Sequence, residues 1–157
     1  MKMFGPNNIS QKTLKMIQGV YEAKLNNVEQ GKVFPSKNKL LITTVGQPLA
    51  CAIDEGRATD RNKIVADVRA ALDQLHGMGI AHCDVALCNT FLLNDGTVML
   101  GDLEYCHNIE DVAPSHLYRS IPRAKTAGDL DELQFQYHFI DKLDALLNAP
   151  IGGVATA

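Results

Sequence analysis

Three side chains in one stretch of the sequence carry oxygen atoms that could act together on a phosphate group or a metal ion. Asp84 is followed five residues later by Asn89, and Asp102 comes after a further short, mostly apolar segment. Carboxylate and amide oxygens are the ligands that hard cations such as Mg²⁺ prefer. Each of the three residues alone is better explained as a turn residue between short strands. Their order and spacing, taken together, favour a joint chemical role.

Two predicted elements would position these side chains. Residues 61–78 carry apolar side chains at three- and four-residue steps, which predicts a helix. Further along the chain, the apolar runs 91–93 and 97–100 flank an Asn-Asp-Gly sequence, and this combination strongly indicates a β-hairpin. The helix would lead into the first aspartate, and the hairpin would separate Asn89 from Asp102.

The order of helix, His-x-Asp, Asn, Asx-Gly hairpin and Asp resembles the catalytic loop and metal-binding segment of protein kinases over residues 64–106. Among kinases it is most similar to fungal kinase-like proteins, and loosely to aminoglycoside- and choline-type phosphotransferases. The resemblance implies that Asp84 and His82 are catalytic: Asp84 takes or orients the proton of a hydroxyl acceptor, and His82 supports the loop. It also implies that Asn89 and Asp102 bind the cofactors Mg²⁺ and ATP for phosphoryl transfer.

The fold implied by this resemblance is α+β, a truncated protein kinase-like fold with a mainly helical C-lobe, a catalytic-loop β-hairpin and a remnant of the N-lobe. Apolar periodicity predicts helices over residues 10–29 and about 129–147. The β-branched run 39–45 predicts a buried strand. In kinases an aspartate on the large C-lobe helix often caps the catalytic-loop backbone, and Asp129 or Asp131 could do so here.

The expected organisation is a single kinase-like domain over residues 1–150. Within it, residues 10–50 would form the N-lobe remnant and the hinge, and residues 51–150 would form the C-lobe. The short apolar tail 151–157 is expected to be disordered.

Several features of the kinase pattern are absent. Neither a phosphate-covering glycine loop nor a strand lysine precedes the first helix, and the family's helix glutamate aligns nearer Gln18 than Glu22. Cys83 replaces the arginine of the catalytic loop, Leu103-Glu104 replaces Phe-Gly, and no lysine or arginine lies between the catalytic aspartate and the asparagine. Each missing electrostatic partner of a transferring phosphoryl group costs about two to three decades in rate.

Three interpretations therefore stay open. The first is a kinase-family phosphotransferase with reduced activity in this chain. The second is an inactive pseudokinase or kinase fragment that acts as an interaction module, with a protein partner covering the surface left by the missing N-lobe strands. The third is an unrelated small α+β domain. The sequence leaves open whether the chain is an enzyme.

Composition argues against several other classes of function. With 157 residues, 46% hydrophobic and 21% charged, the chain suits one globular domain. A net charge of −3 without a Lys/Arg run predicts no binding to nucleic acid or to anionic membranes. Without an apolar stretch near the ~18 residues of a membrane span, and without a signal-peptide pattern, we expect a cytoplasmic protein. The four cysteines fit no paired zinc spacing, so reduced thiols are favoured over a metal site at Cys83, Cys88 and neighbouring histidines.

Overall fold

The computed structural model describes residues 9–117 and 121–149. The predicted tail at 151–157 lies outside these described residues. Helices and small antiparallel sheets alternate along the chain, an arrangement compatible with the α+β class. The helices are α1 (Gln11–Ala23), α2 (Leu49–Asp54), α3 (Arg61–Gly77), α4 (Ala127–Gln134) and α5 (Asp141–Leu147). The strands are β1 (Gly31–Phe34), β2 (Lys39–Ile42), β3 (Gln47–Pro48), β4 (Ile80–Ala81), β5 (Thr90–Leu92), β6 (Val98–Leu100) and β7 (His107–Asn108).

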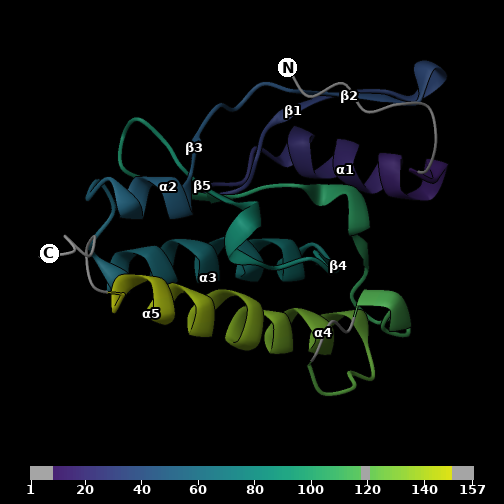
Figure 1. Ribbon diagram of the computed structural model, residues 1–157. Coiled ribbons are helices and arrows are strands. Elements are labelled where there is room, and N and C mark those ends of the chain that lie inside the picture. The colour runs from purple at the N-terminus through teal and green to yellow at the C-terminus, as the bar shows by residue number, and fades with distance from the viewer. Residues whose placement is uncertain (1–8, 118–120, 150–157) are drawn as a thin grey trace, which may run out of the picture.

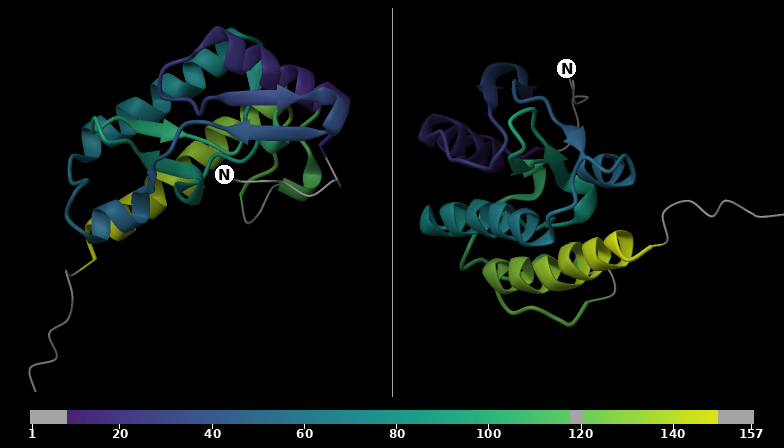
Figure 2. Two further views of the ribbon diagram at one scale, coloured as in Figure 1. Left: turned by 90° about the horizontal axis from the view of Figure 1, so that it is seen from above. Right: turned by 90° about the vertical axis from the view of Figure 1, so that its left-hand side faces the viewer.

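The elements form a smaller layer and a larger layer with the β5–β6 hairpin between them. Figure 1 shows α1 with the β1–β2 hairpin on one side and α3, α4 and α5 on the other, and the right-hand view of Figure 2 agrees. Strand β2 pairs with β1, strand β5 lies between β3 and β6, and β4 pairs with β7. A buried apolar core runs through both layers and includes Leu14 and Ile17 of α1, Leu72 and Leu75 of α3, and Phe139.

The first helix is shorter than predicted. Its N-terminus is as expected, because the Ser10 hydroxyl accepts a hydrogen bond of 3.0 Å from the Thr13 amide. The helix ends at Ala23, since Lys24 adopts a left-handed conformation with φ 50° and ψ 48°. The chain then turns, and Val28 forms an isolated parallel bridge to Leu100 instead of continuing the helix. The prediction of a helix up to residue 29 was therefore wrong in its last turn and a half.

The strand predicted over residues 39–45 is also shorter and less buried than expected. Only Lys39–Ile42 are extended, and they pair on one side with Gly31–Phe34, a strand that was not predicted. Leu40 is the buried residue of β2, whereas Val45 is 84% exposed. Because β2 has a strand neighbour on one side only, its run of apolar side chains cannot be fully covered.

The helix and hairpin predicted around the site are confirmed. Helix α3 begins after Asp60, whose side chain accepts a hydrogen bond of 3.0 Å from the Lys63 amide. In the hairpin, Phe91 lies opposite Met99, and the turn closes at Gly96 with φ 83°. Glycine adopts this left-handed conformation without steric cost, which explains why the Asx-Gly sequence indicated the turn correctly.

The last helical region begins earlier than predicted and contains a change of helix type. Thr126 and Asp129 form a capping box, in which each side chain bonds the other residue's backbone amide, so α4 begins at Ala127. A π-helical segment, Phe135–Ile140, joins α4 to α5. Helix α5 contacts α2 and α3, and α4 contacts β4, the strand that precedes the loop of the predicted site.

Candidate active site

The loop between β4 and β5 begins with a buried histidine that joins two segments of the site. The His82 Nδ1 atom accepts a hydrogen bond of 3.2 Å from the Asp84 amide, so the ring proton lies on Nε2. Nε2 then donates to the carbonyl oxygen of Gly101 at 2.9 Å. His82 therefore links the loop to the residue that precedes Asp102. This position suits the supporting role predicted for His82, and its part in catalysis stays a prediction.

Two side chains of α4 hold the backbone of the same loop. The buried Asp131 carboxylate accepts the amide hydrogens of His82 at 2.8 Å and Cys83 at 2.6 Å. Gln134 accepts from the Val85 amide at 2.9 Å and donates to the Cys83 carbonyl at 3.0 Å. Of the two aspartates proposed to cap the loop, Asp131 does so, whereas the other caps its own helix. These bonds fix a loop in which Cys83 has the left-handed φ of 63°.

The predicted catalytic aspartate and the predicted metal-binding asparagine are in direct contact. The Asn89 side-chain amide donates both to the Asp84 carbonyl at 2.8 Å and to Asp84 Oδ2 at 2.9 Å. Because Nδ2 is used in this way, Oδ1 is the atom through which Asn89 could bind a cation. The Gly101 amide donates to the Asn89 carbonyl at 2.9 Å. Asp102 therefore follows a residue that is bonded to both His82 and Asn89, which brings the segments of all four predicted site residues together.

Asp102 is held through its backbone by a residue that the sequence did not single out. Its amide donates to Glu29 Oε2 at 2.9 Å, and the Tyr21 hydroxyl donates to Glu29 Oε1 at 3.0 Å. Burial and the neighbouring Glu29 carboxylate raise the pKa of Tyr21, so its hydroxyl keeps its proton. Gln18 and Glu22 are the two α1 residues that were compared with the helix glutamate of kinases. Both are exposed, and their side chains bond to each other at 2.8 Å.

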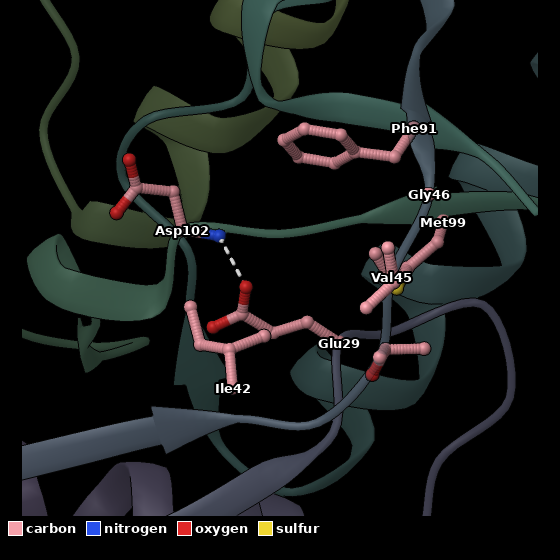
Figure 3. A pocket seen from close by; sticks show the side chains of 8 residues that line it. Glu29, Ile42, Val45, Gly46, Phe91, Met99 and Asp102 are labelled. Atoms are coloured by element: carbon pink, nitrogen blue, oxygen red, sulfur yellow. Dashed lines mark hydrogen bonds between the residues drawn. The ribbon is translucent and has the colours of Figure 1, made fainter. Parts of the chain in front are cut away.

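A cavity of about 210 Å³ opens beside Asp102. Apolar side chains make up most of its wall, and the acidic residues Glu29 and Asp102 also line it. Among the described residues no lysine or arginine does; the lining residues are Glu29, Ile42, Thr44, Val45, Gly46, Phe91, Met99 and Asp102. Figure 3 shows Phe91 on one side of the cavity and Glu29 on the other, with the Asp102 carboxylate pointing away from Glu29. Sites that enclose a drug-sized ligand usually measure about 300–1,000 Å³, so this cavity suits one planar ring system.

Asn89 Oδ1 and the Asp102 carboxylate are oxygen donors of the kind that a cation shared with a substrate would need. Among the described residues, no group of three or more His, Cys, Asp or Glu side chains could hold a metal ion. Asn89 Oδ1 and the Asp102 carboxylate would supply one amide and one acidic ligand, and Mg²⁺ bound to nucleotides commonly uses one or two carboxylates with substrate phosphates and water. The cysteines do not add to this set, because burial raises the pKa of Cys83 and Cys106 and keeps both thiols protonated.

The comparisons with known proteins find a partial similarity to a kinase. No family model matches the chain. Serine/threonine-protein kinase WAG2 of Arabidopsis thaliana is 38% identical over 65 residues, which make up 41% of this chain. The chain spans 13% of that kinase's length in this match. In the part of the chain that the structure describes, every helix is too short or too polar to reach across a lipid bilayer. The similarity supports a protein kinase-like relationship for part of the chain.

Proposed function

We propose that this chain is a protein kinase-like domain that binds Mg-ATP and carries residues for phosphoryl transfer to a hydroxyl group. One observation supports this proposal most strongly: the Gly101 backbone bonds to both His82 and Asn89, so that Asp102 follows at the end of the same network. The Asn89 bond continues the β5–β6 ladder, whereas the buried His82 side chain reaches Gly101 across 19 residues of sequence, which an ordinary turn residue would not do. The partial similarity to a serine/threonine-protein kinase points in the same direction.

Each residue of the network would have a separate task in this reaction. Asp84, oriented by the Asn89 amide, would accept or direct the proton of the attacking hydroxyl. Asn89 Oδ1 and the Asp102 carboxylate would hold Mg²⁺, which when bound would offset negative charge on the phosphates. The apolar cavity between Phe91 and Val45 would take the purine ring. Because no lysine or arginine of the described residues lines the cavity, turnover in this chain alone is expected to be slow.

Nucleotide binding is tested by thermal unfolding with ATP, with and without Mg²⁺. A ligand at ten times its Kd stabilises a protein by about 1.4 kcal/mol, which corresponds to a rise in Tm of about 3–6 °C for a domain of this size. We expect this rise with Mg-ATP and its loss in Asp102→Asn or with excess EDTA. Asp73→Asn, which removes an exposed α3 carboxylate, is the matched control and should keep the rise.

Phosphoryl transfer is measured in the same preparations with γ-labelled ATP and a mixture of hydroxyl acceptors. Label incorporated by the wild type and lost in Asp84→Asn would support transfer. If Mg-ATP produces no rise in Tm, the proposal is wrong. If the rise in Tm persists both in Asp102→Asn and in the presence of EDTA, neither Asp102 nor the metal ion takes part in nucleotide binding.

A second candidate function, an interaction module without chemistry, is favoured by the distribution of charge. Residues 1–48 contain seven lysines and two glutamates, a net charge of +5, whereas residues 49–157 contain eight basic and sixteen acidic residues, a net charge of −8. The β1–β2 hairpin has three exposed lysines, Lys32, Lys37 and Lys39, and no acidic residue. A surface of this kind suits an acidic partner.

The hairpin also has backbone groups to which an extended segment could pair. In the antiparallel register, Lys32 lies opposite Leu41, and the ladder continues with the Thr43 amide bonding the Gln30 carbonyl at 2.8 Å. Alternation along the ladder therefore turns the amides and carbonyls of Leu40 and Ile42 away from β1. Among the described residues, β2 has β1 as its strand neighbour and none on this outer side. Open edges of this kind accept added strands.

For this second function we expect a short peptide of alternating glutamate and valine to bind, with an affinity that falls steeply as salt rises. Exposed charges are screened beyond about 10 Å at 0.1 M salt and about 3 Å at 1 M, so the attraction should be lost over this range. Replacing the three hairpin lysines with glutamine should weaken binding at least about tenfold, as followed by fluorescence anisotropy. Lys63→Gln on α3 is the control. Equal binding of a lysine-valine peptide would contradict the charge argument.

A further inference from the structure

Glu29 combines deep burial with full use of its carboxylate. Its side chain lies in the cavity wall, and the residue is 3% exposed. Oε1 accepts from the Tyr21 hydroxyl at 3.0 Å and Oε2 from the Asp102 amide at 2.9 Å. A buried carboxylate is costly unless its oxygens are bonded, so such a group is retained only where neighbouring donors satisfy it. Both donors here are neutral, and one of them belongs to the predicted metal-binding residue.

The backbone at Asp102 requires support of this kind. Asp102 has φ 66° and ψ 66°, in the left-handed region. That conformation costs a residue with a side chain about a factor of 5 to 30 in population. A hydrogen bond from an amide to a carboxylate contributes about a factor of 10 to 150 in the opposite direction. The bond to Glu29 is therefore large enough to hold Asp102 in this conformation without other help.

The surroundings of Glu29 leave the carboxylate little freedom to move. A Cβ atom at Gly101 would lie 2.9 Å from Glu29 Oε2 and 3.1 Å from the Phe91 ring, so the chain passes directly against the carboxylate. Tyr21 lies on α1 and Asp102 follows β6, while Glu29 belongs to the connection between α1 and β1. The Tyr21–Glu29–Asp102 series thus joins α1 to the metal-binding segment through two hydrogen bonds.

We propose that Glu29 is a positioning residue, which holds Asp102 in its left-handed conformation and so directs the Asp102 carboxylate away from the cavity wall toward the cation site. Tyr21 fixes the second carboxylate oxygen and makes the position of α1 part of the same arrangement. Figure 3 shows the bond, with the Asp102 carboxylate on the side away from Glu29. The role in metal binding rests on the proposed function, whereas the hold on the Asp102 backbone does not.

Two substitutions at Glu29 separate hydrogen bonding from bulk. Glu29→Leu still fills this part of the cavity wall, but it removes the hydrogen bonds to the Tyr21 hydroxyl and the Asp102 amide. Glu29→Gln can still accept from the Asp102 amide and can donate to the Tyr21 oxygen, so it restores the geometry without the charge. Glu22→Leu removes an exposed glutamate of α1 and serves as the control. Tyr21→Phe removes only the bond to the second carboxylate oxygen. If Glu29→Leu does not fold, Glu29→Met, with a longer and more flexible apolar side chain, replaces it in the test.

The first measurement is the Asp102 amide itself, by NMR chemical shift and hydrogen exchange without nucleotide or metal. In Glu29→Leu we expect the amide proton to move upfield and its protection to fall about tenfold or more. Glu29→Gln should stay within about threefold of the wild type, Tyr21→Phe should show a smaller loss than Glu29→Leu, and Glu22→Leu should show no change. An unchanged Asp102 amide in Glu29→Leu, or in Glu29→Met if it replaces that variant, would overturn the proposal.

The second measurement is the Mg²⁺ concentration that gives half of the ATP-dependent rise in Tm. It should increase about tenfold or more in Glu29→Leu and recover in Glu29→Gln, whereas a purely structural role would lower Tm without moving this midpoint. An unmoved midpoint would overturn the link to metal binding. If the wild type shows no rise with Mg-ATP, the proposed function fails, and the amide measurement still decides whether Glu29 positions Asp102.

Discussion

Replacing Asp131 with alanine is expected to lower the free energy of unfolding by about 3–5 kcal/mol and to lower Tm by about 10 °C or more. The carboxylate is fully buried and accepts from the amides of His82 and Cys83 and from His76 Nε2, which lies 2.8 Å from Oδ2. Alanine would leave two buried amides without an acceptor. Hydrogen bonds to charged groups contribute about 1.5–3 kcal/mol each, so the loss of two or three of them gives this magnitude.

The neighbouring residue of the same helix provides the control for this prediction. The Glu132 side chain is 52% exposed and pairs with Arg69 at 2.7 Å, a surface contact expected to contribute less than about 1 kcal/mol. Urea or thermal unfolding of Asp131→Ala and Glu132→Ala therefore distinguishes loop anchoring from a general effect on α4. Similar losses in the two variants would contradict the anchoring role of Asp131.

The consequences of Asp131→Ala should extend to the site. Cys83 has a left-handed φ of 63°, and its amide hydrogen bond to Asp131 stabilises that conformation. Once the loop can relax, Asp84 is no longer fixed relative to Gly101. Mg-ATP binding, if it occurs in the wild type, should therefore weaken in Asp131→Ala even at temperatures where the variant remains folded.

Local patterns made the hairpin and the long helix predictable from the sequence. The Asn-Asp-Gly turn and the three- and four-residue spacing of apolar side chains over residues 61–78 act within a few residues, so their effects can be recognised without knowing the tertiary structure. The end of α1 could not be predicted in this way. The apolar residues Leu25 and Val28 continue the helical spacing, but they pack from a turn in which Lys24 and Asn27 both have positive φ.

The same distinction applies to the candidate site. His82, Asp84, Asn89 and Asp102 were recognised because they lie on one loop and one hairpin, where spacing along the sequence reflects spacing in the fold. Glu29 was not, because its bond to Asp102 spans 73 residues and no local pattern distinguishes it from the exposed acidic residues. A lone glutamate after a helix is ordinarily a solvated residue. Only the three-dimensional arrangement shows that it is buried against the backbone of Asp102.

Gly101→Ala adds a single methyl group and is expected to disrupt the candidate site. Its Cβ would lie 2.9 Å from Glu29 Oε2 and 3.1 Å from Phe91 Cε2, closer than such atoms normally approach. The backbone cannot withdraw easily, since the Gly101 amide bonds the Asn89 carbonyl and its own carbonyl accepts from His82. Glu29 must therefore move and release the Asp102 amide. We expect a loss of stability of about 1–3 kcal/mol, together with the loss of the Mg-dependent rise in Tm with ATP.

Gly19→Ala is the matched control, because the same added methyl group meets open space there. Gly19 lies within α1, and a Cβ atom at this residue would meet no atom of the described residues within 4 Å beyond its own stretch of helix. Alanine stabilises a helix interior by about 0.5–1 kcal/mol relative to glycine, so the two substitutions should change the free energy of unfolding in opposite directions. Of these two glycines, only Gly101 contacts Glu29. A loss of stability in Gly101→Ala together with a gain in Gly19→Ala would therefore attribute the loss to displacement of the Glu29 carboxylate. If Gly101→Ala is as stable as the wild type and still responds to Mg-ATP, Glu29 does not need its observed position, and Asp102 is held by other contacts.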